Sequence, residues 1–533
     1  MASTRLYLQP TIPEKPGSIS VNLFVSPMPP IPIIDLFAGP GGLGEGFSAV
    51  TDKKGRKPFK IGLSIEMDPV AHQTLSLRAA YRHLVSPTAR NLYLDFIQGN
   101  AKYSDFTQHR AASSALGVAA QEARQAELGK IDNATVDQWI KGALGQRDDW
   151  VLIGGPPCQA YSLAGRSRRT KDQSFGQDEK HLLYRQYLRI IRQFAPAIFV
   201  MENVKGILSS KHSGNLIFER IISELSRPRL NLEYEIRSFV CSPGFAGNLP
   251  RDFVIRAEQF GIPQTRHRVV LLGIRKDYSG EEVRLLRPHG TEVSVAEMLA
   301  EMPRVRSRIS KNDNFQDWHA TFTGTLKMLR GWKSDHRAAI EQVIEVSAKA
   351  ALSLEGSAAT PAAKVLRSST HLHKALRAWI GRDAPQTICQ HSPRGHMGSD
   401  LQRYLFASSF ADIAGHSPKL RDFPDRLLPD HANARDEAPP NVDRFRVQLA
   451  SRPSSTVVSH ISKDGHYYIH PDPAQCRSLT VREAARLQTF PDNYFFMGKQ
   501  TDQYAQVGNA VPPYLAIQLG EVVNEVMTRG RRG

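Results

Sequence analysis

One cysteine stands where nucleophilic chemistry is to be expected. Cys158 follows two prolines in the segment GGPPCQAYS, directly after the apolar run DDWVLIGG at 148–155. The prolines restrict the backbone and hold the next residue in place, and active sites of α/β proteins lie where strands end. A lone cysteine is more often a small buried hydrophobic residue. The stiff loop, with polar and basic residues after it, favours a nucleophile instead.

Polar residues close the next apolar run in the same way. Glu202 and Asn203 end the run PAIFVMENV. Ends of neighbouring parallel strands converge, so Glu202 is expected beside Cys158, where a carboxyl group can donate a proton or hydrogen-bond a ring nitrogen. Arg266 and Arg268 are two positions apart, which on a strand puts both side chains on one face, suited to an anion or a polar substrate edge. The structural alternatives are a helix cap for Glu202 and an exposed strand for the arginines.

A glycine-rich turn indicates a nucleotide-like cofactor. Gly39, Gly41 and Gly44 form the pattern G-x-G-x-x-G inside IPIIDLFAGPGGLGEGF, between an apolar run and a helix start. Glycines let the backbone approach such a ligand, and an acid after the second strand, here Glu66, can bind two ribose hydroxyls. The pattern fits NAD as well as S-adenosylmethionine, and it also occurs as a simple tight turn. Asp35 favours S-adenosylmethionine over NAD, because a carboxylate facing the turn suits a cationic ligand and not a pyrophosphate.

The charge balance indicates a polyanionic partner. The 533 residues carry 69 Lys and Arg against 52 Asp and Glu, a net charge of +17, and the pI is about 9.7. Arg166, Arg168, Arg169 and Lys171 fall within six residues without an acid among them. Such a run is typical of a loop that grips phosphates or of a solvated surface loop. Charge alone does not separate DNA from RNA or from an anionic membrane surface.

Composition excludes several classes of protein. Hydrophobic residues make up 41% and charged residues 23%, which excludes a mainly disordered or fibrous chain. No apolar run reaches the ~18 residues of a membrane span. The first residues also lack the charged, apolar and small-residue regions that follow one another in a secretion signal. The four cysteines are scattered without a CxxC pair. We therefore expect no disulfide framework, no metal site and a cytoplasmic location.

These residues need a scaffold of alternating strands and helices. Strand-like runs end before the glycine turn, at Glu66, at Gly155, at Val204 and at 268–274, and segments with the apolar spacing of helices lie between them. Such alternation predicts an α/β fold with a parallel sheet covered by helices on both faces. We expect an N-terminal arm at 1–30, a catalytic domain at 31–280, a second domain at 281–455, a return to the first at 456–527 and a basic tail at 528–533.

Taken in order, these segments resemble the motifs of the cytosine-C5 DNA methyltransferases. DLFAGPGGLGEGF resembles the cofactor loop, GGPPCQAYS the catalytic loop, MENV the catalytic glutamate strand and QTRHR the base-binding arginine pair, while RSLTVREAARLQTFPD and QVGNAVPP resemble the last two motifs. The resemblance implies a Rossmann-like S-adenosylmethionine-dependent methyltransferase domain with a smaller, irregular target recognition domain at 281–455. It also marks about 80–145 as a helical insertion, because Glu66 and Cys158 lie 92 positions apart.

The resemblance implies a role for each matching residue. Cys158 is the nucleophile, and Glu202, Arg266 and Arg268 bind the target cytosine. The residues expected to hold S-adenosylmethionine are Asp35, Phe37, Gly39, Gly41, Gly42, Gly44, Glu66, Met67, Leu183 and Asn509, with Asp132 at the adenine amino group. The residues expected to contact DNA are Gln159, Arg166, Arg168, Arg169, Thr456 and Val457. The candidates for reading base edges are Arg394, His396, Gln402 and Arg403.

The implied activity is DNA (cytosine-5-)-methyltransferase, in which a methyl group passes from S-adenosylmethionine to C5 of a flipped cytosine through a covalent Cys158–C6 adduct. The expected partners are double-stranded DNA and, in a restriction-modification system, a cognate endonuclease. We expect a monomer that is associated with DNA in a prokaryotic cytoplasm and binds no membrane. The alternatives are an RNA cytosine-5 methyltransferase of the same architecture, a non-catalytic DNA-binding homologue and an NAD-dependent oxidoreductase, which would explain the glycine turn but not PPCQ or ENV.

Overall fold

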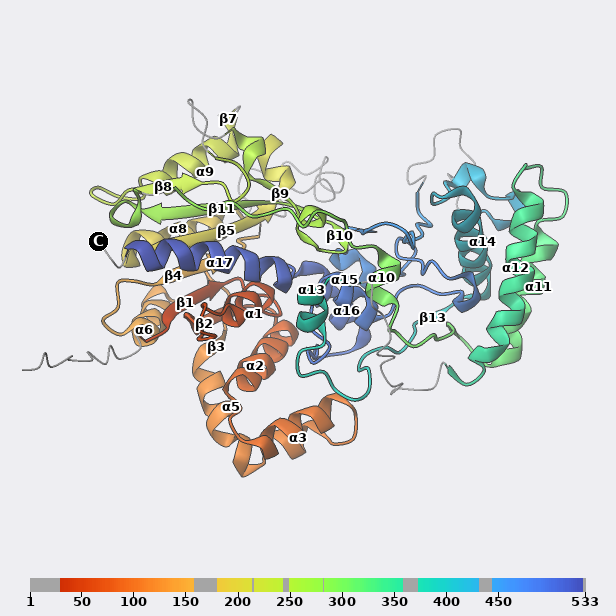
Figure 1. Ribbon diagram of the computed structural model, residues 1–533, viewed down its shortest axis with the longest axis horizontal. Coiled ribbons are helices and arrows are strands. Elements are labelled where there is room, and N and C mark those ends of the chain that lie inside the picture. The colour runs from red at the N-terminus through yellow and green to blue at the C-terminus, as the bar shows by residue number, and fades with distance from the viewer. Residues whose placement is uncertain are drawn as a thin grey trace, which may run out of the picture.

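The computed structural model describes residues 29–157, 180–212, 215–242, 249–280, 282–357, 372–430 and 443–530. Cys158, Gln159, Arg166, Arg168 and Arg169 lie outside these ranges. The described part is elongated, with a sheet-containing domain at one end and a group of long helices at the other, joined by a middle layer of short helices (Figure 1). No helix among the described residues has the length and apolar character that crossing a membrane requires.

An eight-stranded sheet forms the centre of the larger domain, in the order β3-β2-β1-β4-β5-β11-β8, with β9 paired to β11. The parallel strands are β1 (Ile31–Leu36), β2 (Phe59–Glu66), β3 (Ala123–Gln125), β4 (Val151–Gly154) and β5 (Ile198–Val204). The antiparallel pairings involve β11 (His267–Arg275), β8 (Tyr234–Arg237) and β9 (Val254–Arg256). The central parallel strands are apolar and buried, as expected when helices cover both faces. The predicted Rossmann-like α/β fold is confirmed, but the expectation of a wholly parallel sheet is wrong, because β11 runs antiparallel to β5, β8 and β9.

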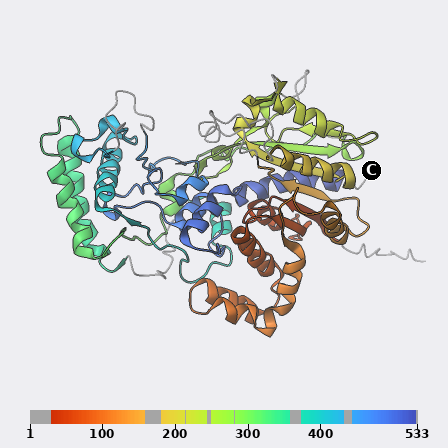
Figure 2. The same ribbon diagram turned by 180° about the vertical axis from the view of Figure 1, so that it is seen from behind.

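Two helical layers cover the sheet, as the views from front and back show (Figures 1 and 2). One layer consists of α1 (Gly42–Ala49) and α17 (Pro513–Gly530), the other of α6 (Asn133–Leu144), α8 (Lys180–Phe194) and α9 (Ile217–Ser226). The helices of the first layer approach closely, since a Cβ on Gly46 would lie 2.4 Å from the Cβ of Ala516. The last helix of the chain thus packs beside the first.

The segment at about 80–145 contains an added layer together with parts of the sheet domain. The added layer consists of α3 (Pro87–Ile97), α4 (Tyr103–Thr107) and α5 (Arg110–Glu122), which share a core with α2 (Pro69–His83). In contrast, β3 and α6 belong to the sheet and to one of its covering layers. Part of the segment expected to be an insertion therefore belongs to the sheet domain. The sequence did not reveal this, because the three residues of β3 form no apolar run.

The region at 281–455, expected to be irregular, contains two groups of helices. α10 (Val295–Leu299) and α13 (Lys374–Ile380) share a core with α15 (Val481–Leu487) and α16 (Gln500–Asn509). The outer bundle consists of α11 (Phe315–Met328), α12 (Arg337–Ala351) and α14 (Gly398–Ala414), and its core includes Ile469 and Cys476. This second core therefore extends beyond residue 455. Its apolar residues recur every three or four positions, as Ile340 and Ile344 do, so they form no continuous apolar run.

Three two-stranded sheets also occur in the part of the chain that the structure describes. Their strands are β10 (Gln264–Thr265) with β14 (Ser454–Ser455), β12 (Arg308–Ile309) with β13 (Gly395–His396), and β6 (Lys211–His212) with β7 (Asn215–Leu216). The pairing of β10 with β14 matters most for the site. It brings the chain just before β11 beside the chain that leaves the region 281–455.

Three buried histidines, His391, His396 and His470, lie against the segment 478–483. His391 contacts the Pro303 carbonyl oxygen at 2.7 Å and Thr480 Oγ1 at 2.9 Å, and His396 contacts Ser478 Oγ at 3.0 Å. Burial lowers the pKa of His391 and of His470 to about 4, and that of His396 to about 3. All three rings are therefore neutral in the folded protein at neutral pH.

Folding is expected to weaken as the pH falls from 7 to 5. The unfolded chain protonates these histidines near pH 6.5, whereas the folded chain does so only near pH 3–4. Their contribution to stability is therefore complete above pH 6.5 and is lost below it, by about 2 kcal/mol per histidine at pH 5. Urea unfolding at pH 7, 6 and 5 measures this slope. His396→Gln should flatten it, and the exposed control His109→Asn should not; an unchanged slope in H396Q would contradict this account.

Candidate functional site

The glycine turn between β1 and α1 leaves room for a ligand on one side only. Phe37, Gly39 and Gly41 have φ of 57°, 57° and 97°, a backbone region that favours glycine. A Cβ on Gly42 would lie 2.2 Å from the Val511 carbonyl oxygen, whereas a Cβ on Gly39 would meet nothing within 4 Å. The turn thus packs against the start of the C-terminal segment and is open at Gly39.

Asp35 lies at the end of β1, directly before this turn. Its side chain is 1% exposed, and no side chain among the described residues hydrogen-bonds either carboxylate oxygen, although the Gly44 amide lies near enough to lower its pKa. A Cβ on Gly44 would lie 2.9 Å from Oδ2, so the carboxyl group faces the first turn of α1. Burial raises the pKa of Asp35 to about 8, while Arg82 lowers it. A buried carboxyl group without a side-chain partner fits a site that a cationic ligand completes.

Glu66 ends β2 on the open side of the turn. Its Oε2 accepts a hydrogen bond from the Gly39 amide at 2.7 Å, and its Oε1 accepts one from the Asp68 amide at 2.8 Å. Burial raises the pKa of Glu66, and these two amides oppose the shift. Met67 follows with 54% of its surface exposed. The structure thus brings together the glycine turn, Glu66 and Met67, as the sequence predicted for a cofactor site.

The remaining predicted cofactor residues come from three helices. Leu183 is half-buried in α8, and Asn509 is exposed at the end of α16. Asp132 is exposed at the N-terminus of α6, beyond the end of β3. The residue that pairs in register with Glu66 is Gln125, the last of β3. Gln125 therefore lies beside Glu66 at the strand ends, a position that the sequence analysis did not single out because β3 is too short to leave a pattern.

The strand ends at β4 and β5 converge as predicted. A Cβ on Gly155, just after β4, would lie 2.9 Å from Glu202 Oε2. Asn203 of β5 donates from Nδ2 to the Pro156 carbonyl oxygen at 3.2 Å. The chain that leads to Cys158 therefore passes directly beside Glu202, although Cys158 itself lies outside the described residues.

An ion pair orients the Glu202 carboxylate. Arg268 of β11 places Nε 2.9 Å from Glu202 Oε1, and both side chains are 14% exposed. Arg268 also donates to the His267 carbonyl oxygen at 2.9 Å. Burial lowers the pKa of Arg268, and Glu202 opposes that shift. A carboxyl group held in this way beside the loop that follows β4 can donate a proton or a hydrogen bond to a bound ring.

Arg266 has a different environment from Arg268. It lies between β10 and β11, where its amide donates to the Gln264 carbonyl oxygen at 2.9 Å, so the strand alternation is broken there. Its guanidinium is buried and donates to the carbonyl oxygens of Val457 at 2.9 Å and Gly508 at 3.5 Å. Burial lowers the pKa of Arg266 well below its usual range, with Arg268 adding to the shift. Arg266 therefore ties together three distant segments behind the Glu202 pair.

Comparison with known proteins identifies the family. The family described as C-5 cytosine-specific DNA methylase matches residues 121–525. The chain belongs to this family. The matched range includes Glu202, Arg268 and the segments that Arg266 joins.

Relatives along nearly the whole length support the same conclusion. Type II methyltransferase M.Bpa9945I of Bacillus paralicheniformis is 31% identical over 513 residues, which cover 93% of this chain and 99% of the relative. Type II methyltransferase M1.HphI of Haemophilus parahaemolyticus is 25% identical, covering 93% and 87%. A solved structure described as that of a "putative DNA modification methyltransferase" encoded within an E. coli prophage shares the fold, with a TM-score of 0.51, 18% identity and coverage of 93% and 99%. The predicted activity, DNA (cytosine-5-)-methyltransferase, is confirmed, and the oxidoreductase alternative is excluded.

In the methylase, Thr456 and Val457 follow β14, where the chain leaves the region 281–455 beside β10. Thr456 is half-buried and donates from Oγ1 to the Thr265 carbonyl oxygen at 2.6 Å. Val457 is buried, and its amide donates to Gln264 Oε1 at 2.9 Å. Gln264 donates in turn to Gln488 Oε1 at 3.0 Å. These contacts fix the segment through its backbone, which sequence spacing did not reveal.

The candidate base readers of the methylase make contacts within the protein. His396 is 5% exposed. Arg403 donates to Asp400 and to the Leu427 carbonyl oxygen. Arg394 donates to the Ile461 carbonyl oxygen and lies 4.4 Å from the ring centroid of Tyr504. A Cβ on Gly324 would lie 2.7 Å from Gln402 Nε2, so Gln402 packs against α11. These contacts hold all four side chains against other residues of the protein.

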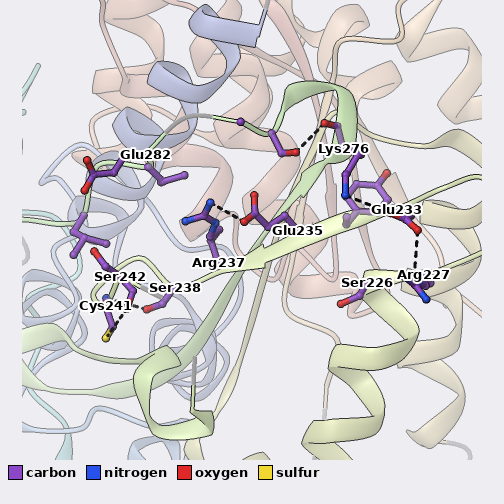
Figure 3. Close-up of a pocket in the computed structure, with 15 residues that line it drawn as sticks. Ser226, Arg227, Glu233, Glu235, Arg237, Ser238, Cys241, Ser242, Lys276 and Glu282 are labelled. Atoms are coloured by element: carbon purple, nitrogen blue, oxygen red, sulfur yellow. Dashed lines mark hydrogen bonds and ion pairs between the residues drawn. The ribbon is translucent and has the colours of Figure 1, made fainter. Parts of the chain in front are cut away.

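A separate cavity of about 760 Å³ lies near β8, the end of α9 and the residues after β11 (Figure 3). Its charges pair with one another: Arg237 with Glu235 at 2.6 Å, and Glu233 with Arg227 at 3.3 Å and with Lys276 at 3.6 Å. None of the described residues that line it belongs to the predicted site. The cavity is therefore no part of the catalytic centre of the methylase.

Proposed function

We propose that this methylase acts on a specific sequence of double-stranded DNA with Cys158 as the nucleophile and Glu202 as the group that activates the cytosine ring. The observation that carries the proposal is the Glu202–Arg268 pair, which lies directly beside the loop that leads to Cys158. The target carbon is inaccessible inside a duplex, so the base must turn out of the helix. The basic residues Arg166, Arg168 and Arg169 are suited to contacts with the DNA phosphates, and Gln159, next to Cys158, is suited to contacts with the DNA at the flipped base.

The reaction follows from the weak nucleophilicity of cytosine C5. The Cys158 thiolate forms a bond to C6, and the ring electrons move toward C5 while Glu202 supplies a proton or a hydrogen bond at N3. S-adenosylmethionine, held by Asp35, Glu66 and the glycine turn, would supply an electrophilic methyl group to C5, with its sulfur–methyl bond broken and S-adenosylhomocysteine left as the product. Removal of the C5 proton and loss of the thiolate then restore the aromatic ring. Arg268 holds Glu202 in place throughout.

The cofactor site fits S-adenosylmethionine, a ligand that carries a sulfonium cation. The Asp35 carboxyl group has no side-chain partner and suits a positive charge, the open space at Gly39 admits the ligand, and Glu66 suits the ribose hydroxyls. Met67, exposed beside Glu66, is suited to cover the adenine ring.

Cofactor affinity is expected to rise with pH up to about 8. A cationic ligand favours ionised Asp35, so below pH 8 binding must release a proton from this residue, which weakens affinity by up to about tenfold per pH unit. Calorimetry with S-adenosylmethionine between pH 6 and 9 measures the slope. The amino group of the ligand also titrates near pH 8, so the wild type is compared with Asp35→Asn. Binding to the variant should release about one proton fewer, and its affinity should therefore change less with pH. Equal slopes in both proteins would remove Asp35 from the site.

The biological setting proposed is a bacterial restriction-modification system or a stand-alone modification enzyme. Both relatives are named type II methyltransferases, which favours DNA over RNA. A cognate endonuclease for the same site, a monomeric state and a place beside the DNA in the cytoplasm belong to this proposal.

Bisulfite sequencing tests the proposal. DNA from cells that express the protein should contain 5-methylcytosine at one short sequence, and cells that express Cys158→Ala should not. Methylation of transfer RNA with unmodified DNA would establish the RNA alternative. Binding of DNA without methylation of either substrate would establish a non-catalytic homologue.

A further inference from the structure

A buried carboxylate holds the helix that begins at the glycine turn. Glu45 lies in the first turn of α1 and is 1% exposed. Arg78 of α2 donates to it twice, from Nε to Oε2 at 2.9 Å and from Nη2 to Oε1 at 2.6 Å, and Arg82 lies 3.5 Å from Oε2. Burial alone would raise the pKa of Glu45, but Arg78, Arg382 and Arg82 hold it well below its usual range. The carboxylate therefore stays charged.

One of these arginines comes from the region 281–455, the proposed recognition region. Arg382 follows α13 and donates from Nη2 to Glu45 Oε1 at 2.6 Å, across 337 positions of sequence. Its guanidinium lies 4.4 Å from the ring centroid of Trp379, an arrangement that orients the side chain. The next residue, Asp383, accepts a hydrogen bond from Tyr81 of α2 at 2.8 Å. The end of α13 is thus fastened to α1 and α2.

α13 is also fixed to the middle layer. Trp379 donates from Nε1 to the Thr489 carbonyl oxygen at 2.7 Å, and the Asp492 amide donates to the Ile380 carbonyl oxygen at 2.9 Å. A shift of the middle layer, which contains α13, relative to α1 and α2 would therefore be transmitted to Arg382, and through it to Glu45.

We propose that Arg382 is a positioning residue for the cofactor, which holds the first turn of α1 through Glu45 and thereby couples the recognition region to the cofactor turn. This rests on the cofactor site proposed above. Gly41 and Gly44 lie within four residues of Glu45, and Asp35 faces Gly44, so a small tilt of this turn moves the groups that hold the cofactor. Coupling between two ligands is reciprocal. DNA should therefore tighten cofactor binding, and the cofactor should tighten DNA binding by the same factor.

Removal of Arg382 leaves no buried charge unpaired. Glu45 keeps both bonds from Arg78 and the approach of Arg82, and the Arg382 side chain is itself 32% exposed. Arg382→Met keeps an unbranched side chain beside Trp379, so the protein is expected to fold. Arg377 on the same helix offers a matched control, because it pairs with Glu301 at 3.2 Å.

The test measures the affinity of the full-length protein for S-adenosylhomocysteine by calorimetry, with and without target duplex, and the KM and kcat for S-adenosylmethionine. In R382M, Kd and KM are expected to rise about fivefold to tenfold, with kcat changed less than about twofold. R382K should recover part of the loss, and R377M should match the wild type. The factor by which DNA tightens cofactor binding should shrink toward one in R382M alone.

Two results would overturn the proposal. One is unchanged cofactor affinity in R382M; the other is an equal loss in R377M, which would mean a general loosening of α13. Glu66→Ala tests the cofactor site separately. If the site is right, this variant binds the cofactor more weakly, and that result does not depend on the outcome for R382M. A wild-type protein that binds no S-adenosylhomocysteine would refute the site itself.

Discussion

Cys158→Ala is expected to lower the rate of methyl transfer by at least about 10⁴-fold. Without the thiolate, C5 of cytosine is too weak a nucleophile to attack the methyl group, and no other described side chain at the strand ends replaces it. Single-turnover transfer of a labelled methyl group to a target duplex measures the loss. Cofactor binding, measured by calorimetry, should remain near the wild-type value because Cys158 acts on the base.

The same residue should form a bond that outlasts denaturation. Duplex DNA with 5-fluorocytosine at the target should trap the wild-type enzyme, since fluorine cannot leave as a proton does, and the trapped complex should require the cofactor. Cys241→Ala is the matched control, because Cys241 is a free, half-buried cysteine that lines the remote cavity. Trapping by C158A, or its loss in C241A, would contradict the assignment of the nucleophile.

The parts of the fold that the sequence predicts are those where burial leaves a continuous apolar run. β1, β4 and β5 are covered on both faces, so their runs are unmistakable and the parallel sheet follows from them. β3 is three residues long and carries Arg124 and Gln125, so nothing marks it in the sequence. The helices of the outer bundle bury one face each, and their periodic pattern is weaker than a run.

The site was predictable where it depends on strand ends and unpredictable where it depends on distant backbone. The meeting of Gly155 with Glu202 follows from the convergence of β4 and β5. The placement of Arg266 does not, because the chain turns there and its partners, Val457 and Gly508, lie 191 and 242 positions away. Glu45 likewise reads as a surface charge in a short helix until the arginines from α2 and α13 are known.

Glu202→Gln is expected to lower the transfer rate by about 10²-fold to 10⁴-fold, the range for a positioned acid. Glutamine fills the same space but cannot supply a proton to N3, so addition of the thiolate to C6 becomes harder. Trapping on 5-fluorocytosine DNA should slow by a similar factor, because Glu202 acts on the addition step. Cofactor affinity should stay unchanged; a loss as large as the loss of rate would place Glu202 in the cofactor site instead.

Arg268→Met should lower the rate by about 10²-fold, since Arg268 acts by orienting Glu202. The double variant should then lose little beyond E202Q alone, because the two residues work as one pair 2.9 Å apart. Glu235→Gln is the matched control: it breaks the Arg237–Glu235 pair of 2.6 Å at the remote cavity and should leave transfer unchanged. Additive losses in E202Q/R268M would show that Arg268 acts on the substrate independently of Glu202.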